Sequence, residues 1–454
     1  MRLIQPQNKY MIREGMKLVA AGDSTVAQNH GLSSDADAIS QEDTGNGITL
    51  LQAELGHPFI FNVAKNYGTS GSDAHRVGHN KGVSGDKIQG LLDRLETDVL
   101  DLNPDIVSTS ILTNDVASAD DEGVYVLFEK AKSLTERILN AGAVYMPGLI
   151  YPRNAADGSS DWDNDAERQK MIHLNDMLWA YWSQLAHMGN KILPVDTFTP
   201  LVNRLSDNFT AITGATKDSV HLSNVGTHYV MEAHKAALAP FNLKNLKRGW
   251  EGLEQYDANG VEYGNLLPDL SGTGGNTDDG STGDVAADWR MDMSTGANTA
   301  MACSKISAPD GGTDPWQQIV LTCTGAGAGL EIARFRPDPV GTTNTVAGEW
   351  YVAQCEVDIP ECDDAGLEKA YYIKMDDATS PNRDSYGGLL DSGDEPLPRA
   401  HRKRTIRTPY WQAQNDGDEF RWEFRAGVDA SQTGSTTIKL GRCVMNRVPA
   451  PDFA

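Results

Sequence analysis

The stretch Lys17-Leu18-Val19-Ala20-Ala21-Gly22-Asp23-Ser24 decides the fold of the first half of the chain. Its apolar run is short and ends at a glycine, which predicts a buried strand followed by a turn. Ser24 therefore stands directly after a strand. Similar short apolar runs alternate with amphipathic helical stretches up to about residue 243. We expect further strands at 105–111, 143–150 and 191–195, and helices at 86–100, 123–140, 165–188 and 223–238.

This alternation predicts a parallel sheet that is covered by helices on both faces, an α/β fold. The helix expected at 86–100 illustrates the pattern, because Ile88, Leu91 and Leu95 fall on one of its faces. In folds of this kind, functional groups gather at the carboxyl ends of the strands. Ser24 occupies such a position.

Length and charge limit the class of protein and its partners. With 454 residues the chain is too long for one compact core, so we expect two domains. A net charge of −24 argues against nucleic acid and anionic membrane surfaces as partners. No stretch approaches the roughly twenty apolar residues of a membrane helix. Residues 1–17 lack the apolar core of a signal peptide.

The five cysteines all lie in the last third of the chain. An odd number without a signal peptide favours reduced thiols and synthesis in a cytoplasm. No Cys/His spacing suggests a metal site, and we expect no cofactor.

After Pro240 the pattern changes to short alternating segments. In 420–425, for example, Phe420, Trp422 and Phe424 alternate with charged residues, as in a half-buried antiparallel strand. Several such strands with turn signals between them predict a jelly-roll-like β-sandwich. We therefore divide the chain into an α/β domain at 1–247 (core 16–240), a linker at 248–264 and a β-sandwich at 265–454.

Five residues of the first domain have the chemistry of a serine esterase. Ser24 is the candidate nucleophile, His221 the base that takes its proton, and Asp218 the acid that fixes the tautomer of His221. An oxyanion needs donors already in place. The Ser24 N–H, the Gly85 N–H at the start of a helix and the Asn114 amide at a strand end are the candidates.

Together these residues resemble the SGNH (GDSL-type) hydrolase family. Gly22–Thr25 resembles its first block, Gly82–Asp86 its second, Asn114-Asp115 its third and Asp218–His221 its last. The resemblance covers about residues 16–240. It implies a three-layer α/β/α sandwich with a parallel sheet, and ester hydrolysis through an acyl-serine.

Two positions depart from the family pattern, and one block has a second copy. Leu112 stands where the family usually has glycine, and Leu222 where proline commonly follows the histidine. The stretch Asn66–Gly71 repeats the pattern of the second block, so Gly71 is an alternative to Gly85 as the oxyanion glycine. The family-like distance to Asn114 favours Gly85.

Parts of the second domain resemble modules of bacteriophage tail proteins. The segments are Gly264–Pro268, Val285–Trp289 and Thr437–Arg442. This resemblance implies a carbohydrate-binding or trimerising module on a virion, with a homotrimer and other tail proteins as partners. The substrate would then be an acetylated polysaccharide of a bacterial surface.

A basic run, Arg399–Arg404, stands out in this acidic chain and is followed by aromatic residues. Cations near aromatic rings suit an acidic glycan. The candidate ligand-binding residues are Arg402, Arg404, Tyr410 and Trp411. The alternative is a solvated strand edge whose charges block edge pairing.

Three functions follow from these observations. The first is a carbohydrate O-acetylesterase that acts on a polymeric glycan. The second is a general carboxylesterase or lipase. The third is a structural or receptor-binding virion protein with an inactive first domain.

Overall fold

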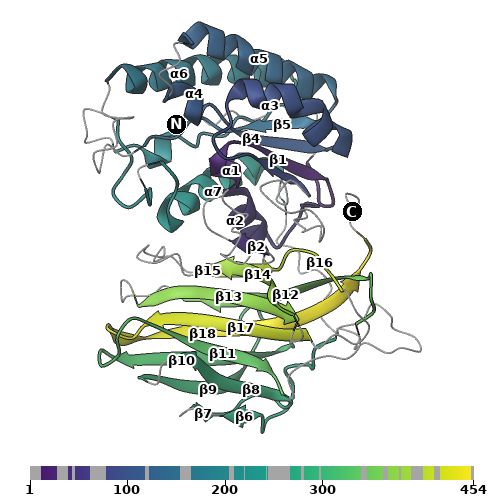
Figure 1. Cartoon of the computed structure of the whole chain (residues 1–454), viewed down its shortest axis with the longest axis vertical. Helices are drawn as coiled ribbons and strands as arrows, with labels where there is room; N and C mark the ends of the chain where they lie inside the picture. Colours follow the sequence, from purple (N-terminus) through teal and green to yellow (C-terminus); the bar gives the residue numbers. More distant parts are fainter. Residues whose placement is uncertain are drawn as a thin grey trace.

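The computed structural model describes residues 12–27, 39–42, 47–61, 78–117, 122–153, 165–203, 209–218, 220–241, 243, 266–277, 281–295, 298–338, 345–360, 367–377, 380–389, 402–413 and 420–450. The first part is an α/β unit, and the second consists of two β-sheets (Figure 1). The linker predicted at 248–264 and the alternative oxyanion residue Gly71 lie outside the described residues.

A parallel sheet with strand order β3-β1-β4-β5 forms the centre of the first part. Its strands are β1 (Leu18–Gly22), β3 (Asn80–Gly82), β4 (Ile106–Ser110) and β5 (Val144–Pro147). The strands predicted at 17–21, 105–111 and 143–150 are therefore confirmed. The segment 191–195 forms isolated parallel bridges through Ile192 and Val195 instead of a continuous strand.

Helices cover both faces of this sheet. On one face lie α3 (Ile88–Arg94), α5 (Val124–Asn140) and α6 (Asp165–His187). On the other lie α2 (Gly47–Leu55) and α7 (Asn224–Leu238) (Figure 1). Alternate residues of a strand point to opposite faces. Accordingly, Val19 and Ala21 pack with the first group, and Leu18 and Ala20 with the second. The predicted three-layer α/β/α sandwich is confirmed.

The shorter helical elements are α1 (Ser24–Ala27), α4 (Thr113–Val116), a π-helix (Leu95–Val99) and 3₁₀-helices at Leu100–Leu102, Thr199–Leu201 and Ala239–Phe241. The helix predicted at 86–100 is therefore divided: α3 begins at Ile88, and the π-helix follows it from Leu95. Asn80–Gly82 forms a strand that the sequence does not predict. A three-residue polar strand has no readable period, and tertiary contacts hold it: the Asn80 amide donates to the Val26 carbonyl oxygen at 2.9 Å.

The second part is a β-sandwich, as predicted. One sheet has the order β15-β12-β18-β10-β9-β7 with β16 paired to β12, and the other β2-β14-β13-β17-β11-β8-β6. Both sheets contribute to one apolar core, in which Trp289 stacks on Phe335 at 4.6 Å and meets Trp422 edge-on at 5.4 Å. The strands are β6 (Asn276–Thr277), β7 (Thr282–Gly283), β8 (Trp289–Thr295), β9 (Thr299–Ser307), β10 (Pro315–Thr324), β11 (Leu330–Pro337), β12 (Trp350–Ile359), β13 (Glu368–Asp377), β14 (Ser380–Leu389), β15 (Arg402–Arg407), β16 (Trp411–Gln412), β17 (Phe420–Asp429) and β18 (Thr433–Val448).

Four of the five cysteines are described, and all four are free thiols buried in the sandwich: Cys303, Cys323, Cys355 and Cys443. Among the helices in the described ranges, none has the length and apolar character needed to cross a membrane.

The first part of the chain supplies a strand to the second. β2 (Ile39–Glu42) follows the Ser24 helix in sequence but pairs in parallel with β14 at the edge of the sandwich. α2 returns to the α/β sheet and also contacts β15. Just after α2, His57 Nε2 lies 2.8 Å from the carbonyl oxygen of Thr405. The two parts are therefore interlocked, although the sequence divides them at residue 247.

Candidate active site

Ser24 lies where β1 ends and α1 begins. Gly22 is required there by close packing, because a Cβ would collide with the carbonyl oxygen of Ser110 on β4. Asp23 is fully buried, and its Oδ1 accepts a hydrogen bond from the Thr25 N–H at 2.9 Å. Burial raises the pKa of Asp23. The turn thus holds the Ser24 hydroxyl rigidly at the carboxyl edge of the sheet.

The fold brings His221 and Asp218 to Ser24. His221 Nε2 lies 2.9 Å from the Ser24 Oγ, and His221 Nδ1 lies 2.6 Å from Asp218 Oδ2. Partial burial alone would raise the pKa of Asp218, but hydrogen bonds from the ring and backbone of His221 outweigh it and lower that pKa. An ionised Asp218 accepts a hydrogen bond from the Nδ1–H of His221, which leaves the Nε2 lone pair directed at the Ser24 hydroxyl.

Backbone hydrogen bonds on both sides of His221 fix its loop. The His221 carbonyl oxygen accepts from the Lys217 N–H at 2.9 Å, and the Ser223 N–H donates to the Ala215 carbonyl oxygen at 2.9 Å. Ser223 is the N-cap of α7, and its Oγ accepts from the Gly226 N–H at 3.2 Å. The base therefore precedes a capped helix, while its side chain is 24% exposed and open to a substrate.

Gly85 lies in a turn that contacts the segments of Ser24 and Asn114. The Val83 N–H donates to the Gly22 carbonyl oxygen at 3.0 Å. The Asn114 amide donates to the Asp86 carbonyl oxygen at 2.9 Å. Gly85 has φ = +74°, a left-handed conformation that favours glycine. The structure thus joins all four sequence blocks, while the oxyanion roles of Gly85, Asn114 and the Ser24 N–H remain predictions.

One detail of the Gly85 prediction is wrong. The sequence places its N–H among the first donors of a helix, but α3 begins at Ile88 with Lys87 as its N-cap. Gly85 therefore belongs to the turn before the helix. Its N–H is oriented by the turn and by the hydrogen bonds of Val83 and Asn114, rather than by a helical turn.

Leu112, one of the two departures from the family pattern, keeps the backbone shape that glycine would give. It has φ = +84° at the N-cap of α4 and is 2% exposed. A left-handed conformation is costly for a leucine, and the surrounding core must compensate. Leu222, the second departure, is buried beside His221 and also fits the fold.

Arg94 is a positioning residue that the sequence does not single out. Its Nη2 donates to the Gly22 carbonyl oxygen at 3.1 Å, and its Nη1 donates to the Lys81 carbonyl oxygen at 2.8 Å. Its Nε and Nη2 also contact Asp86 Oδ2, at 3.0 and 2.9 Å. One guanidinium therefore ties the turn of Ser24 to the turn of Gly85. An arginine on an amphipathic helix carries no sequence signal for this role.

A second buried carboxylate lies below the site. Asp115 Oδ2 accepts from the Ile88 N–H at 3.0 Å, which links α4 to the start of α3. Burial raises the pKa of Asp115 to about 6, and the negative charge of Asp23 adds to the increase. Asp115 thus braces the segment that carries Asn114.

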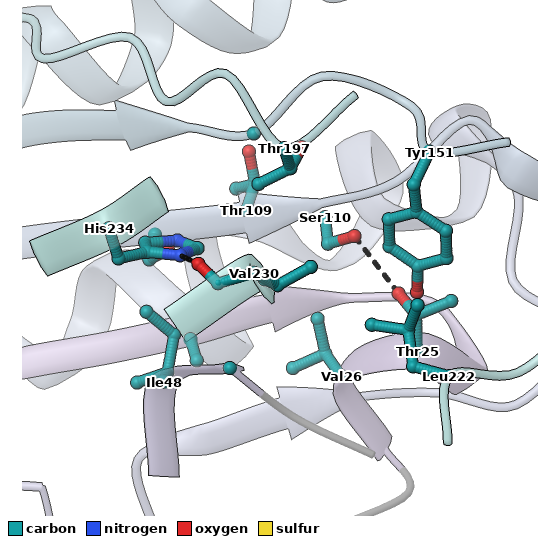
Figure 2. A pocket seen from close by; sticks show the side chains of 14 residues that line it. Thr25, Val26, Ile48, Thr109, Ser110, Tyr151, Thr197, Leu222, Val230 and His234 are labelled. Atoms are coloured by element: carbon teal, nitrogen blue, oxygen red, sulfur yellow. Dashed lines mark hydrogen bonds between the residues drawn. The ribbon is translucent and has the colours of Figure 1, made fainter. Parts of the chain in front are cut away.

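A small cavity of about 30 Å³ lies next to Thr25, between the sheet and helices α2 and α7 (Figure 2). Thr25 and Leu222 line it next to the candidate nucleophile and base, and Thr25 Oγ1 donates to Ser110 Oγ at 3.0 Å. His234 lies at its far side, and burial lowers the pKa of this histidine to about 4. The space is sufficient for about two water molecules.

The candidate ligand-binding residues of the second domain are mostly buried. Arg402 and Arg404 are 1% and 4% exposed, and both guanidinium groups lie over the Tyr371 ring. Trp411 is 1% exposed and belongs to the core. The prediction that these three bind a glycan is therefore wrong. Tyr410 is half-buried beside Arg407, and its role stays a prediction.

Among the described residues, no group of three or more His, Cys, Asp or Glu side chains is placed to hold a metal ion.

No family model matches the chain, and no curated protein matches it in sequence. Solved structures of several hydrolases resemble about half of it. A GDSL-like lipase from Bacteroides thetaiotaomicron is 21% identical, covers 49% of this chain and 88% of its own, and has a TM-score of 0.36. Axe2, an acetylxylan esterase from Geobacillus stearothermophilus, is 18% identical, covers 53% of this chain and 100% of its own, and has a TM-score of 0.36. LAE5, an alpha/beta hydrolase enzyme from the metagenome of Lake Arreo, is 18% identical, covers 51% of this chain and 98% of its own, and has a TM-score of 0.37. Likenesses at this level do not establish a function.

Proposed function

We propose that this protein is a serine ester hydrolase of the SGNH type that removes O-acetyl groups from a polymeric glycan. One observation carries the proposal: Ser24, His221 and Asp218 form a continuous hydrogen-bonded line at the carboxyl edge of the parallel sheet, with distances of 2.9 and 2.6 Å. A hydroxyl, an imidazole and an ionised carboxylate in this order make an activated nucleophile.

The reaction divides into two steps. In the first, the Ser24 Oγ attacks the ester carbonyl carbon while His221 Nε2 takes the hydroxyl proton. His221 then returns this proton to the departing sugar oxygen, the ester C–O bond breaks and an acyl-serine remains. In the second step, His221 takes a proton from a water molecule that attacks the acyl group. Acetate leaves, and the proton returns to Ser24.

The proposed donors act on the charge that develops in each step. The N–H groups of Ser24 and Gly85 and the amide of Asn114 would stabilise the oxyanion, which is a large term in acyl transfer. Asp218 stabilises the imidazolium that forms when His221 holds the proton. Arg94 and Asp115 keep the contributing turns in place through their hydrogen bonds.

The small cavity beside Thr25 and Leu222, of about 30 Å³, is compatible with a short acyl group and has no room for a long acyl chain. The β-sandwich supports a polymeric substrate, because a second domain next to a small esterase offers a separate surface for a chain of sugars. A lipase or general carboxylesterase and a non-catalytic virion protein remain the competing functions.

Two chromogenic esters separate these functions. Purified protein is assayed with p-nitrophenyl acetate and p-nitrophenyl palmitate, with Ser24→Ala as the control. We expect turnover of the acetate and about a 10⁴-fold or greater loss in Ser24→Ala. Ser84→Ala is the matched control, because Ser84 is an exposed serine one residue from Gly85. A preference for palmitate, or equal rates in both variants, contradicts the proposal.

Acetate release from a panel of acetylated bacterial polysaccharides then identifies the glycan. Turnover of the small ester without release from any polymer would reduce the proposal to a general carboxylesterase. The assignment to a phage tail and the homotrimer are predictions from the sequence of the second domain alone. Light scattering of the purified protein tests the trimer.

A further inference from the structure

One outer face of the β-sandwich carries a cluster of charged side chains. Along β8, β11 and β17, one set of alternate residues belongs to the apolar core between the sheets. The other set points away from that core. It includes the residues that we call the arginine face: Arg290, Asp292, Arg334, Arg336, Glu423 and Arg425.

Two buried carboxylates hold the guanidinium groups of this face. Asp292 is 1% exposed and contacts Arg334 Nε at 2.7 Å and Arg336 Nη2 at 2.6 Å. Arg290 Nε lies 3.2 Å from the same carboxylate. Glu423 accepts from Arg425 Nε at 2.8 Å. Two carboxylates balance only two of the four guanidinium charges that they contact, and they fix the arginine side chains before any ligand arrives.

The opposite sheet shows that an outer face of this sandwich does not need arginines. There, Ala302, Val320 and Thr437 lie side by side in register on β9, β10 and β18. The arginines do not protect a sheet edge either, because β11 and β17 each have a neighbouring strand on both sides. In a chain with a net charge of −24, solubility also gives no reason to concentrate cations here.

We propose that the arginine face binds a carboxylate-bearing polysaccharide. The planar fork of arginine matches a carboxylate in bidentate geometry. Arg334 on β11 is the direct register partner of Arg425 on β17, and Arg336 is that of Arg290 on β8, so the four arginines form two cross-strand pairs. The side chains of Arg334 and Arg425 are 23% and 17% exposed, which leaves part of each accessible.

Binding at this face is independent of the proposed chemistry at Ser24, so the two are tested separately. The Ser24→Ala full-length protein is titrated with polygalacturonate, a carboxylate-bearing polymer, and with neutral dextran. We expect saturable binding of polygalacturonate that weakens on addition of salt, and none of dextran. The double variant Arg334→Gln/Arg336→Gln should bind at least ten-fold more weakly.

Two further variants keep the test decisive. Lys439→Gln removes a cation from the outer face of the other sheet and should bind as the parent does. Arg334→Lys/Arg336→Lys keeps the charges around Asp292 but loses the planar forks, and should still weaken binding several-fold. Circular dichroism melting confirms that each variant is folded. Three results would overturn the proposal. They are an unchanged affinity in both arginine variants, a loss in Lys439→Gln as large as that in the arginine variants, and binding of single-stranded DNA as tight as that of polygalacturonate.

Discussion

The two halves of the molecule use polar side chains in different places. In the α/β half, Ser24, Asn114 and His221 stand in turns at the carboxyl edge of the sheet, where the fold gathers segments that are distant in sequence. In the β half, charged side chains lie on strand faces, as in the arginine face, or at the junction, where neighbouring elements cover Arg402 and Arg404. Removal of a turn residue should change activity with little change in stability, whereas removal of a covered residue should do the reverse.

Asp218→Asn should produce the largest change after loss of the nucleophile. Oδ1 already accepts from the backbone N–H groups of Val220 and His221, so the amide NH2 of the variant would face Nδ1 and donate to it. The His221 proton then lies on Nε2, which can no longer take the Ser24 proton, and the negative charge that stabilises the imidazolium is lost. We expect kcat to fall about 10³- to 10⁴-fold with an almost unchanged melting temperature, because the Asp218 side chain is 51% exposed. Steady-state kinetics with p-nitrophenyl acetate measure the change. A loss of less than ten-fold would remove Asp218 from the mechanism.

Arg404→Met tests the opposite half of the comparison. Arg404 is buried at the junction over Tyr371, and its Nε lies 3.6 Å from Glu54 on α2. We expect the free energy of unfolding to fall by about 2 kcal/mol, because the buried Tyr371 hydroxyl loses the hydrogen bond that Arg404 Nη1 donates to it and, of its described partners, Glu54 keeps only Lys235. Arg407→Met, on the same strand but half-buried, is the matched control and should cost about 1 kcal/mol or less. Urea denaturation measures both variants. Equal losses would show that burial at the junction adds nothing to the contribution of Arg404 to stability.

Arg94→Met probes a residue that belongs to neither category, because it is half-buried yet ties together two turns of the site. We expect kcat to fall about ten-fold, with a small change in KM, as the turns of Ser24 and Gly85 lose their common anchor. Arg137→Met is the matched control: its Nη1 donates to the Leu92 carbonyl oxygen on α3, away from the turns. An equal loss of kcat in both variants would mean that Arg94 acts only through general stability.

The smallest effect on activity comes from His234, which acts on the pH dependence of stability. Burial lowers the pKa of His234 to about 4, so the unfolded chain takes up the proton first as the pH falls. This histidine therefore reduces stability progressively below about pH 6.5, by at most about 3 kcal/mol near pH 4. Asp115 acts in the opposite sense, because its raised pKa lowers stability as the pH rises from about 4 to 6.

The contribution of His234 is isolated by comparison of His234→Gln with the parent protein. As the pH falls from 7 to 4, the melting temperature of His234→Gln should rise relative to that of the parent protein. Activity at pH 7 should change little, since His234 lies at the far side of the cavity from Thr25, the neighbour of Ser24. A constant difference over this range contradicts the assignment of His234 as a buried neutral histidine.

Most of the α/β half can be read from the sequence because its signals are local. An apolar run that ends at a glycine gives a strand and a turn, and a helical period gives the covering helices. Spacing alone places Asp218 next to His221. The sequence fails where a segment has no period of its own: β3 is three polar residues, and β2 belongs to the other sheet. Arg94 also escapes notice, because its contacts with Gly22 and Lys81 exist only after folding.

In the β half, too, local patterns can be read from the sequence, whereas burial cannot. Alternation correctly predicts that Trp422 and Phe424 face the core, with Glu423 and Arg425 on the other side. It does not say where charged residues on the inner side of a strand end up. Arg402 and Arg404 look exposed in sequence, yet they are the register partners of the core residues Ile359 and Val357, and both lie over the ring of the core residue Tyr371. The arginines of the arginine face, by contrast, keep part of their side chains accessible. Strand period is a property of the backbone, but burial depends on what packs against the strand.

By itself, the sequence determined the three-layer α/β/α sandwich, the β-sandwich and the identity of the Ser24, Asp218 and His221 candidates. Periodicity, turn residues and short spacings carry that information, and each acts within a few positions of the chain. Only the tertiary structure decided that His221 Nε2 reaches the Ser24 Oγ, that β2 joins the sandwich and that the arginines of the junction are buried. These depend on contacts between residues far apart in sequence, which form when the sheets and helices pack together.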